Sequence, residues 1–161
     1  MAEIEIQVAT EDDVPLLLSL IRELADYERL SHEVVATEET LRDSLFGGRQ
    51  LAETLLAHLG DEPVGFALFF HNFSTFLGRP GIYLEDLYVK PEFRGAGVGR
   101  ALLVRIAGLA KERNCGRLEW SVLDWNEPAI GFYERIGASP VSGWTVYRVT
   151  GEALEELAAG G

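Results

Sequence analysis

The sequence predicts a mixed α/β domain in which helices cover both faces of a β-sheet. The predicted elements are, in order, a strand, two helices, three strands, a helix, a strand, a helix and a strand, and this order suits such a sheet. Of the 161 residues, 47% are hydrophobic, which is enough for the core of one domain spanning residues 1–161. A glycine-rich turn joins a predicted strand to a predicted helix past the middle of the chain.

The first half of the chain predicts a strand, two helices and a hairpin. Isoleucine and valine alternate with polar residues in the first segment, as in a strand with one buried face. Leucines then recur at helical spacing, and Thr37 with two glutamates after it has the form of a second helix start. Two apolar runs joined by Gly60 and Asp61 predict the hairpin. The predicted segments are residues 4–8, 10–28, 37–47, 51–59 and 64–73.

The second half predicts two further helices and three strands around the glycine turn. A loop over residues 72–81 precedes a strand rich in β-branched and aromatic residues. Asn126, with an acid and a proline after it, predicts a helix start, and Gly137 predicts its end. Thr150 is expected to cap a short terminal helix. The predicted segments are strands at residues 82–89, 117–123 and 144–149, and helices at residues 101–113 and 126–137.

The glycine turn has the form of an anion-binding site. Residues 94–99 read Arg-Gly-Ala-Gly-Val-Gly, and the N–H groups at the start of the following helix have no partner inside it. A P-loop is excluded because Arg100, not lysine followed by serine or threonine, comes after Gly99. A dinucleotide fingerprint would need a glycine at position 100. A tight turn whose glycines only supply positive φ angles stays an alternative.

The charge of the chain argues against two classes of partner. Lysine and arginine number 14 and aspartate and glutamate 26, so the net charge is −12. Such a chain repels nucleic acid and anionic membranes, and neither is an expected partner. The excess of acid fits a cationic substrate, although solubility alone would explain it equally well.

Cysteine, histidine and the apolar runs bound the compartment and the cofactors. Cys115 is the only cysteine, so no intrachain disulfide forms and a reducing compartment is expected. The first residues do not resemble a signal peptide and the apolar runs are short, which together predict a cytoplasmic protein. The three histidines show no metal-ligand spacing, so no metal is expected.

Four stretches of the sequence resemble one enzyme family. They read Glu-Leu-Ala-Asp-Tyr-Glu at residues 23–28, Leu-Glu-Asp-Leu-Tyr-Val at 84–89, the turn at 94–99, and Trp-Asn-Glu-Pro-Ala-Ile-Gly-Phe-Tyr at 125–133. They resemble the GNAT superfamily of N-acetyltransferases and, within it, the spermidine/spermine (diamine) and thialysine N-acetyltransferases. The resemblance implies a mostly antiparallel mixed sheet, acetyl-coenzyme A as co-substrate, a small-molecule amine as acceptor, and a homodimer with contacts from residues 144–149.

The chemistry of acetyl transfer requires a base and an acid. A lysine-like amine has a pKa of about 10.4, so a base must take its proton before it attacks a thioester. The thiolate of coenzyme A, with a pKa of about 8.5, leaves more easily beside a proton donor. The resemblance implies Glu85 as the base, in contact with substrate, and Tyr133 as the acid. The alternatives are a solvated or ion-paired carboxylate at Glu85 and a core tyrosine at Tyr133. Strand alternation predicts that the side chains of Glu85 and Asp86 point to opposite sides of the strand.

The resemblance also implies binding residues. Backbone groups of one strand would pair with the pantetheine arm, the turn would hold the pyrophosphate, and the start of a later helix would contact the cofactor. Asn126 also suits a plain helix cap, and Glu28 a plain exposed helix end. The cofactor residues are Leu87, Tyr88, Val89, Arg94, Gly95, Ala96, Gly97, Val98, Gly99, Arg100, Asn126, Glu127, Pro128 and Ala129, and the substrate residues are Tyr27, Glu28 and Glu85.

The loop before the central strand departs from the polyamine-specific pattern. It lacks the acidic residue that precedes an aromatic one there, and reads Ser74-Thr75-Phe76 instead. A lysine-like or thialysine-like amino acid is then at least as good a substrate as a polyamine, and Arg79 is a candidate to receive its carboxylate. The expected function is acetyl-coenzyme A dependent N-acetyl transfer to a primary amine. The alternatives are a catalytically silent coenzyme A sensor and a protein or peptide lysine acetyltransferase.

Overall fold

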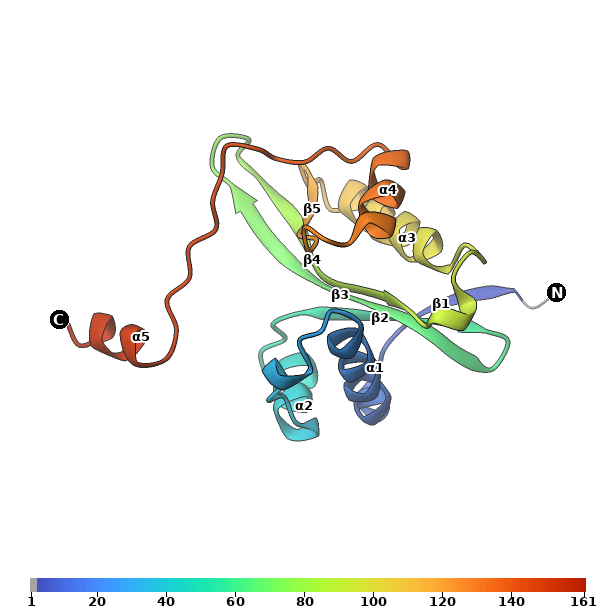
Figure 1. Cartoon of the computed structure of the whole chain (residues 1–161), viewed down its shortest axis with the longest axis horizontal. Coiled ribbons are helices and arrows are strands. Elements are labelled where there is room, and N and C mark those ends of the chain that lie inside the picture. The colour runs from blue at the N-terminus through green and yellow to red at the C-terminus, as the bar shows by residue number, and fades with distance from the viewer. Residues whose placement is uncertain (1–2) are drawn as a thin grey trace. The chain divides into compact units, whose positions relative to one another are not determined.

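Five strands form one sheet in chain order, β1-β2-β3-β4-β5 (Figure 1). Strands β1 to β4 are antiparallel to their neighbours, and β5 runs parallel to β4. This confirms the predicted mixed and mostly antiparallel sheet. The bounds are β1 Ile4–Val8, β2 Glu53–Leu59, β3 Glu62–Ser74, β4 Arg79–Val89 and β5 Leu118–Trp120.

The computed structural model describes residues 3–161, which fall into two compact units on either side of the bond between Leu123 and Asp124. The first unit holds the sheet with helices α1 Val14–Tyr27, α2 Glu38–Phe46 and α3 Val98–Glu112. The second unit holds α4 Glu127–Arg135 and α5 Gly151–Ala158. Within residues 3–161 no helix is both long and apolar enough to cross a membrane.

Helices cover both faces of the sheet in the first unit. Helices α1 and α2 lie on one face and α3 on the other (Figure 1). Leu17, Leu20 and Leu24 of α1 pack against a row of side chains that crosses three neighbouring strands, and α3 buries its own apolar side against the opposite face. The row consists of Leu56, Phe66 and Tyr88, which are register partners in turn. The helical periodicity of the sequence therefore identified the sides that face the core.

The predicted helix starts are formed by capping residues. Thr37 accepts the N–H of Thr40 at 3.1 Å and caps α2. Residues 11–13 form a short 3₁₀ turn, so α1 begins at Val14, and Pro15 stands in the first turn where its missing N–H costs nothing. Both predicted helices are confirmed, with the first starting four residues later than predicted.

The predicted loop at residues 72–81 is wrong. Strand β3 continues to Ser74 and β4 begins at Arg79, so only a tight turn separates them. Pro80 pairs in register with Phe73 of β3, and β5 begins only opposite Ile82. The missing N–H of Pro80 therefore removes no bond from the ladder.

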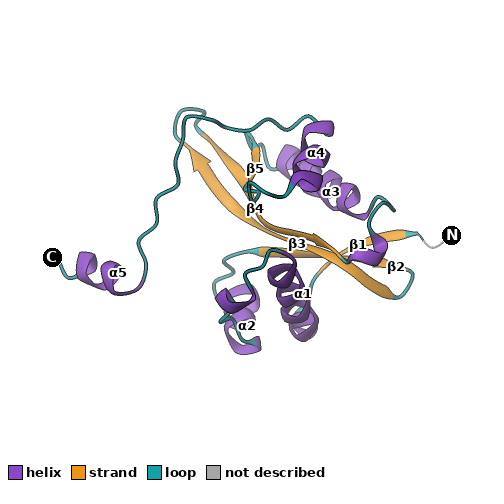
Figure 2. Cartoon of the chain, viewed as in Figure 1, coloured by secondary structure: helices purple, strands orange, loops and turns teal. Residues whose placement is uncertain are grey.

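The predicted strand at residues 144–149 is also absent. This stretch has no regular secondary structure and is drawn as loop in Figure 2. Trp144, Val146 and Tyr147 are 83%, 84% and 92% exposed. The sequence has strand composition, but a strand forms only where it pairs with a neighbour, and the sheet described within residues 3–161 consists of β1 to β5 alone. The predicted strand at residues 117–123 is shortened to Leu118–Trp120.

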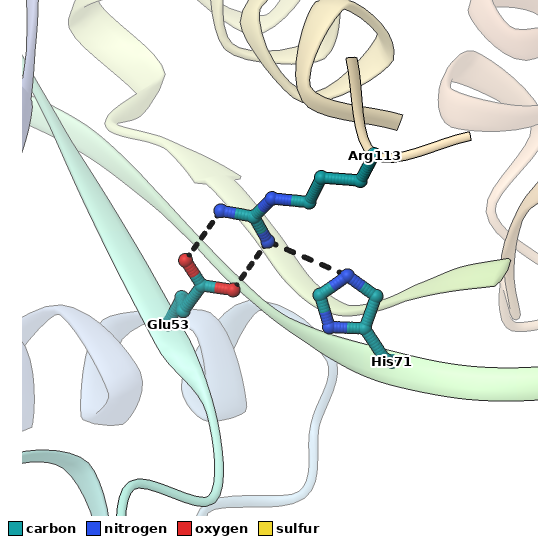
Figure 3. A network of polar contacts seen from close by, with 3 residues as sticks. All are labelled: Glu53, His71 and Arg113. Atoms are coloured by element: carbon teal, nitrogen blue, oxygen red, sulfur yellow. Dashed lines mark hydrogen bonds and ion pairs between the residues drawn. The ribbon is translucent and has the colours of Figure 1, made fainter. Parts of the chain in front are cut away.

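One ion pair joins the end of α3 to the sheet. Arg113 donates to both carboxylate oxygens of Glu53, at 2.6 and 2.8 Å, and Nε2 of His71 lies 3.4 Å from the same guanidinium (Figure 3). Arginine only donates, so Nε2 of His71 is the acceptor in this contact. The hydrogen bonds and charge of Arg113 lower the pKa of Glu53 below its ordinary value of 4.5.

Replacing Glu53 by glutamine is expected to reduce the acid sensitivity of the fold. A carboxylate with a lowered folded pKa stabilises the protein above 4.5, and this stabilisation is lost as the pH falls through the folded pKa. Because the Arg113–Glu53 pair is about one-third exposed, the stabilisation lost on protonating Glu53 is roughly 1 kcal/mol. The free energy of unfolding in urea should fall less steeply at acid pH in Glu53→Gln than in the wild type. The exposed Glu62→Gln control should show the wild-type dependence. An unchanged dependence in Glu53→Gln would contradict the assignment.

Candidate active site

The glycine turn leads directly into α3, which begins at Val98 rather than at the predicted residue 101. Gly95 and Gly97 have φ angles of 84° and 87°, in the region that favours glycine. The first intrahelical bond runs from the Ala101 N–H to the Gly97 carbonyl at 2.9 Å. The N–H groups of the first turn therefore have no partner within the helix, and together with the helix dipole they suit a phosphate.

Beside this turn lies an open hollow at the N-terminal end of α3. Its volume is about 400 Å³, and it is lined by Ile6, Gly97, Arg100, Ala101, Val104 and Arg105. Arg100 and Arg105 bring two positive charges to a chain whose net charge is −12. The predicted pyrophosphate residues Gly97 and Arg100 thus lie together at a site of local positive charge.

Strand β4 has an unpaired edge next to the turn. Strand β5 pairs only with Ile82, Tyr83 and Leu84, so the rest of β4 has no strand partner on that side in the described part of the chain. The Lys90 N–H donates to the Val64 carbonyl on β3, and alternation turns the backbone groups of Leu87 and Val89 the other way. An extended amide-bearing arm could pair with this edge, as predicted for Leu87 and Val89. The backbone N–H and carbonyl of Tyr88 point to β3 instead.

A β-bulge lies at the predicted base. The register runs from the pair of Leu68 with Asp86 to the pair of Phe69 with Leu84, so Glu85 faces no partner. Strict alternation cannot be assumed across this bulge, so the prediction that Glu85 and Asp86 point to opposite sides of the strand stays a prediction. Glu85 is exposed, whereas Asp86 and Glu28 are partly buried.

The three carboxylates influence one another. The pKa of Asp86 is raised to about 7, first by burial and then by the negative charges of Glu85 and Glu28. Burial also raises the pKa of Glu28. The fold thus brings Glu28, at the end of α1, into the electrostatic neighbourhood of Glu85 and Asp86 on β4. Such a cluster suits an ammonium group, which would relieve the repulsion. The sequence analysis did not assign a role to Asp86, and its only sequence signal was its position next to Glu85.

Replacing Asp86 by asparagine is expected to stabilise the protein at high pH. Unfolded Asp86 loses its proton near 3.8 and folded Asp86 near 7, so between these values the folded state binds more protons and stability falls as the pH rises. Asparagine mimics the protonated form and removes this fall, which is worth about 1.4 kcal/mol for each pKa unit of the shift. Urea unfolding at both ends of that pH range measures it, with the exposed Asp61→Asn as control. Parallel pH profiles for wild type and Asp86→Asn would contradict the raised pKa.

Arg94 does not extend freely from the turn. Its Nε donates to the Val89 carbonyl at 3.0 Å, and its guanidinium carbon lies 4.5 Å from the ring centroid of Tyr27 and 5.9 Å from that of Tyr88. Tyr88 donates to Glu23 of α1 at 3.3 Å. The structure therefore brings the predicted substrate residue Tyr27 together with the predicted cofactor residues Tyr88 and Arg94.

The remaining predicted residues lie in the second unit. Tyr133 is partly buried on α4, with its ring centroid 5.6 Å from that of Phe132. Asn126 caps α4, because its Oδ1 accepts the Ala129 N–H at 3.4 Å, and Glu127 and Pro128 form the first turn. This confirms the predicted helix cap. Roles in catalysis and cofactor binding stay predictions for these five residues.

Arg79 is not placed to receive a substrate carboxylate near Glu85. It lies six residues up the same strand, a distance of about 20 Å at the rise of a β-strand. Its Nη2 donates to the Cys115 carbonyl at 3.2 Å and so holds the connection between α3 and β5. Within residues 3–161 no group of three histidine, cysteine or acidic side chains is arranged to hold a metal.

A turn suited to an anion, beside an open strand edge and a carboxylate cluster, is the arrangement expected of an enzyme that takes a group from a phosphate-bearing donor. The chain belongs to the acetyltransferase (GNAT) family, whose sequence model matches residues 18–138, across both units. It is accordingly an N-acetyltransferase.

Relatives of this family resemble the chain over nearly its whole length. Thialysine N-epsilon-acetyltransferase of Bos taurus is 41% identical, with 98% of this chain and 99% of the relative aligned. L-ornithine N5-acetyltransferase NATA1 of Arabidopsis thaliana is 33% identical over 94% of this chain and 86% of its own. The structure of the integron cassette protein VCH_CASS6 from V. cholerae superposes with a TM-score of 0.81 at 29% identity, over 98% of each chain.

Proposed function

We propose that the protein transfers the acetyl group of acetyl-coenzyme A directly to a primary amine of a small cationic molecule. The observation that carries the proposal is the carboxylate cluster in which Glu28, at the end of α1, lies near Glu85 and Asp86 of β4, the strand whose open edge precedes the glycine turn. The cluster offers an acceptor for protons and a partner for an ammonium group. The turn and the start of α3 offer backbone N–H groups for the pyrophosphate.

In the proposed reaction Glu85 takes a proton from the amine, either directly or through water. The amine nitrogen attacks the thioester carbonyl carbon, and as the C–S bond breaks the nitrogen passes its second proton to water, which leaves a neutral amide. Tyr133 gives its proton to the departing thiolate and regains one from solvent. The other predicted residues bind: Leu87 and Val89 through backbone groups, Gly95 to Arg100 at the pyrophosphate, and Asn126 to Ala129 at the cofactor. Residues 1–161 act as one domain in this proposal, in the cytoplasm, with no metal.

The substrate we favour is an amino acid with a side-chain amine. Two curated relatives are named for thialysine and for L-ornithine, and both of these compounds carry a terminal amine on an amino acid. The tight turn at residues 75–78 has no acidic residue to hold a second ammonium group of a polyamine. A polyamine stays the second candidate, because a relative is named for spermidine/spermine acetylation.

Release of free thiol from acetyl-coenzyme A tests the proposal directly. The acceptors are thialysine, lysine, ornithine, spermidine, putrescine and a short lysine peptide, each compared at equal concentration. We expect the amino acids to react faster than the polyamines and the peptide. Fastest release with spermidine would overturn the substrate assignment, and fastest release with the peptide would make the protein a lysine-tail acetyltransferase. Binding of acetyl-coenzyme A without release to any amine would favour a sensor.

We further propose a homodimer that uses residues 144–149. The support is the strand-like composition of this stretch and the exposure of Trp144, Val146 and Tyr147. Burying these three side chains against a second copy would remove a large apolar surface from water. Analytical ultracentrifugation should give a dimer for the wild type and a monomer for Val146→Asp. A monomeric wild type at micromolar concentration would refute the proposal.

A further inference from the structure

The side chain of Arg94 connects three elements of the first unit. It starts at the first residue of the glycine turn, reaches the end of β4 through the bond from Nε to the Val89 carbonyl, and lies over the ring of Tyr27 at the end of α1. The distance of 4.5 Å from the guanidinium carbon to the Tyr27 centroid is within the range of a cation–π contact. Through Arg94 the turn is therefore attached both to strand β4 and to helix α1.

The two rings beneath Arg94 are fixed by their own surroundings. Tyr88 is 4% exposed, packs against Phe66 in the core and donates to Glu23 of α1. Tyr27 is partly buried in the last turn of α1 and packs against the same core cluster. Arg94 therefore lies on a surface that the core holds in place.

The turn itself has few other restraints. A Cβ placed on Gly95 would meet nothing within 4 Å, and one on Gly97 would only reach Ile4 at 4.0 Å. The glycines thus serve the positive φ angles, not close packing. Glycine-rich backbone has many accessible conformations, so an attachment at its first residue has a large effect on its order.

We infer that Arg94 is a positioning residue that holds the cofactor turn in register with the amine-side residues Tyr27 and Glu28 by stacking on Tyr27, and does not contact the pyrophosphate. The inference rests on the proposed function for the roles of the turn and of Tyr27, but the attachment itself is independent of them. It also reassigns Arg94, which the resemblance had placed among the cofactor contacts. Cofactor and amine sites would then be ordered together.

The first test is the order of the turn without any ligand. Backbone ¹⁵N order parameters of Gly95 and Gly97 are measured in the wild type, Arg94→Lys, Tyr27→Leu and Tyr27→Phe. We expect them to fall from about 0.85 towards about 0.6 in Arg94→Lys and Tyr27→Leu. Lysine keeps the charge but lacks the planar group that stacks while it donates to Val89. Tyr27→Phe keeps the ring and should match the wild type. Unchanged values in both Arg94→Lys and Tyr27→Leu would overturn the inference.

The second test is the affinity for acetyl-coenzyme A by calorimetry. If Arg94 acts through Tyr27, Arg94→Lys and Arg94→Gln should each raise Kd by about two- to fivefold, as expected from the loss of one exposed cation–π contact. The double variant Arg94→Lys with Tyr27→Leu should then bind no more weakly than either single one. A wild-type Kd in Arg94→Lys with a weakened Arg94→Gln would show a direct phosphate contact and refute the inference. A wild type that does not bind acetyl-coenzyme A would refute the proposed function alone, and the order parameters would then decide the role of Arg94.

Discussion

Glu85→Gln is expected to lower kcat by about 10²- to 10⁴-fold, the usual contribution of a general base. At neutral pH only about one lysine-like amine in a thousand lacks its extra proton, and glutamine cannot accept that proton. The bulge leaves Glu85 outside the register of β3 and β4, so the substitution removes a charge but no ladder partner. Steady-state rates of thiol release with the best amine measure the loss.

Two controls separate catalysis from folding and binding in this variant. The Kd for acetyl-coenzyme A should stay within about twofold of wild type, and the exposed Glu62→Gln should keep full activity. Because a hydroxide-dependent route replaces the base, log kcat of Glu85→Gln should rise with pH over a wider range than in the wild type. If Glu85→Gln kept more than a tenth of the wild-type kcat, another group would have to be the base, and Asp86 would be the first to test.

Tyr133→Phe is expected to lower kcat by about 10²-fold, at the lower end of the usual range for an acid–base group. A coenzyme A thiolate, with a pKa of about 8.5, can leave without a proton, so the loss is smaller than for the base. Phenylalanine keeps the ring that packs beside Phe132 on α4 and removes only the hydroxyl. The measurement is the same rate of thiol release, together with the Kd for acetyl-coenzyme A.

The control for this variant is Tyr83→Phe, which removes a hydroxyl that lies 2.6 Å from Ser121 and has no proposed role in catalysis or in the dimer. We expect its rate to equal that of the wild type. Equal rates for wild type and Tyr133→Phe would rule out Tyr133 as the proton donor. A wild type that binds the cofactor and never releases thiol would make the silent sensor the better description, and Tyr133→Phe would then change nothing.

Much of the first unit could be predicted because its signals are local. Leucines at helical spacing, the Thr37 cap and the hairpin glycine each act within a few residues, and each element formed within a few residues of its predicted bounds. The glycine turn was found for the same reason. Its exact junction with α3 was missed because Gly97, with φ of 87°, already serves as the helix cap.

The features that the sequence did not predict depend on contacts between residues distant in sequence. Residues 144–149 have strand composition, yet composition cannot supply the neighbouring strand that a ladder requires. The same holds at the site. Alternation along β4 predicted opposite sides for Glu85 and Asp86 without a bulge, and only the register with β3 revealed the bulge at Glu85. The contact of Arg94 with Tyr27 joins positions 67 residues apart and left no local signal.

The short β5 strand has a consequence for handling the protein. Because β5 ends at Trp120, β4 has no strand partner past Leu84 on that side within residues 3–161, and an unpaired edge is a template for association between chains. A molecule that pairs with this edge would shield it and would stabilise the folded state by about 2.7 kcal/mol at a hundredfold excess over its Kd. Preparations depleted of coenzyme A should therefore aggregate sooner on heating, and adding it back should raise Tm in proportion to the logarithm of its concentration.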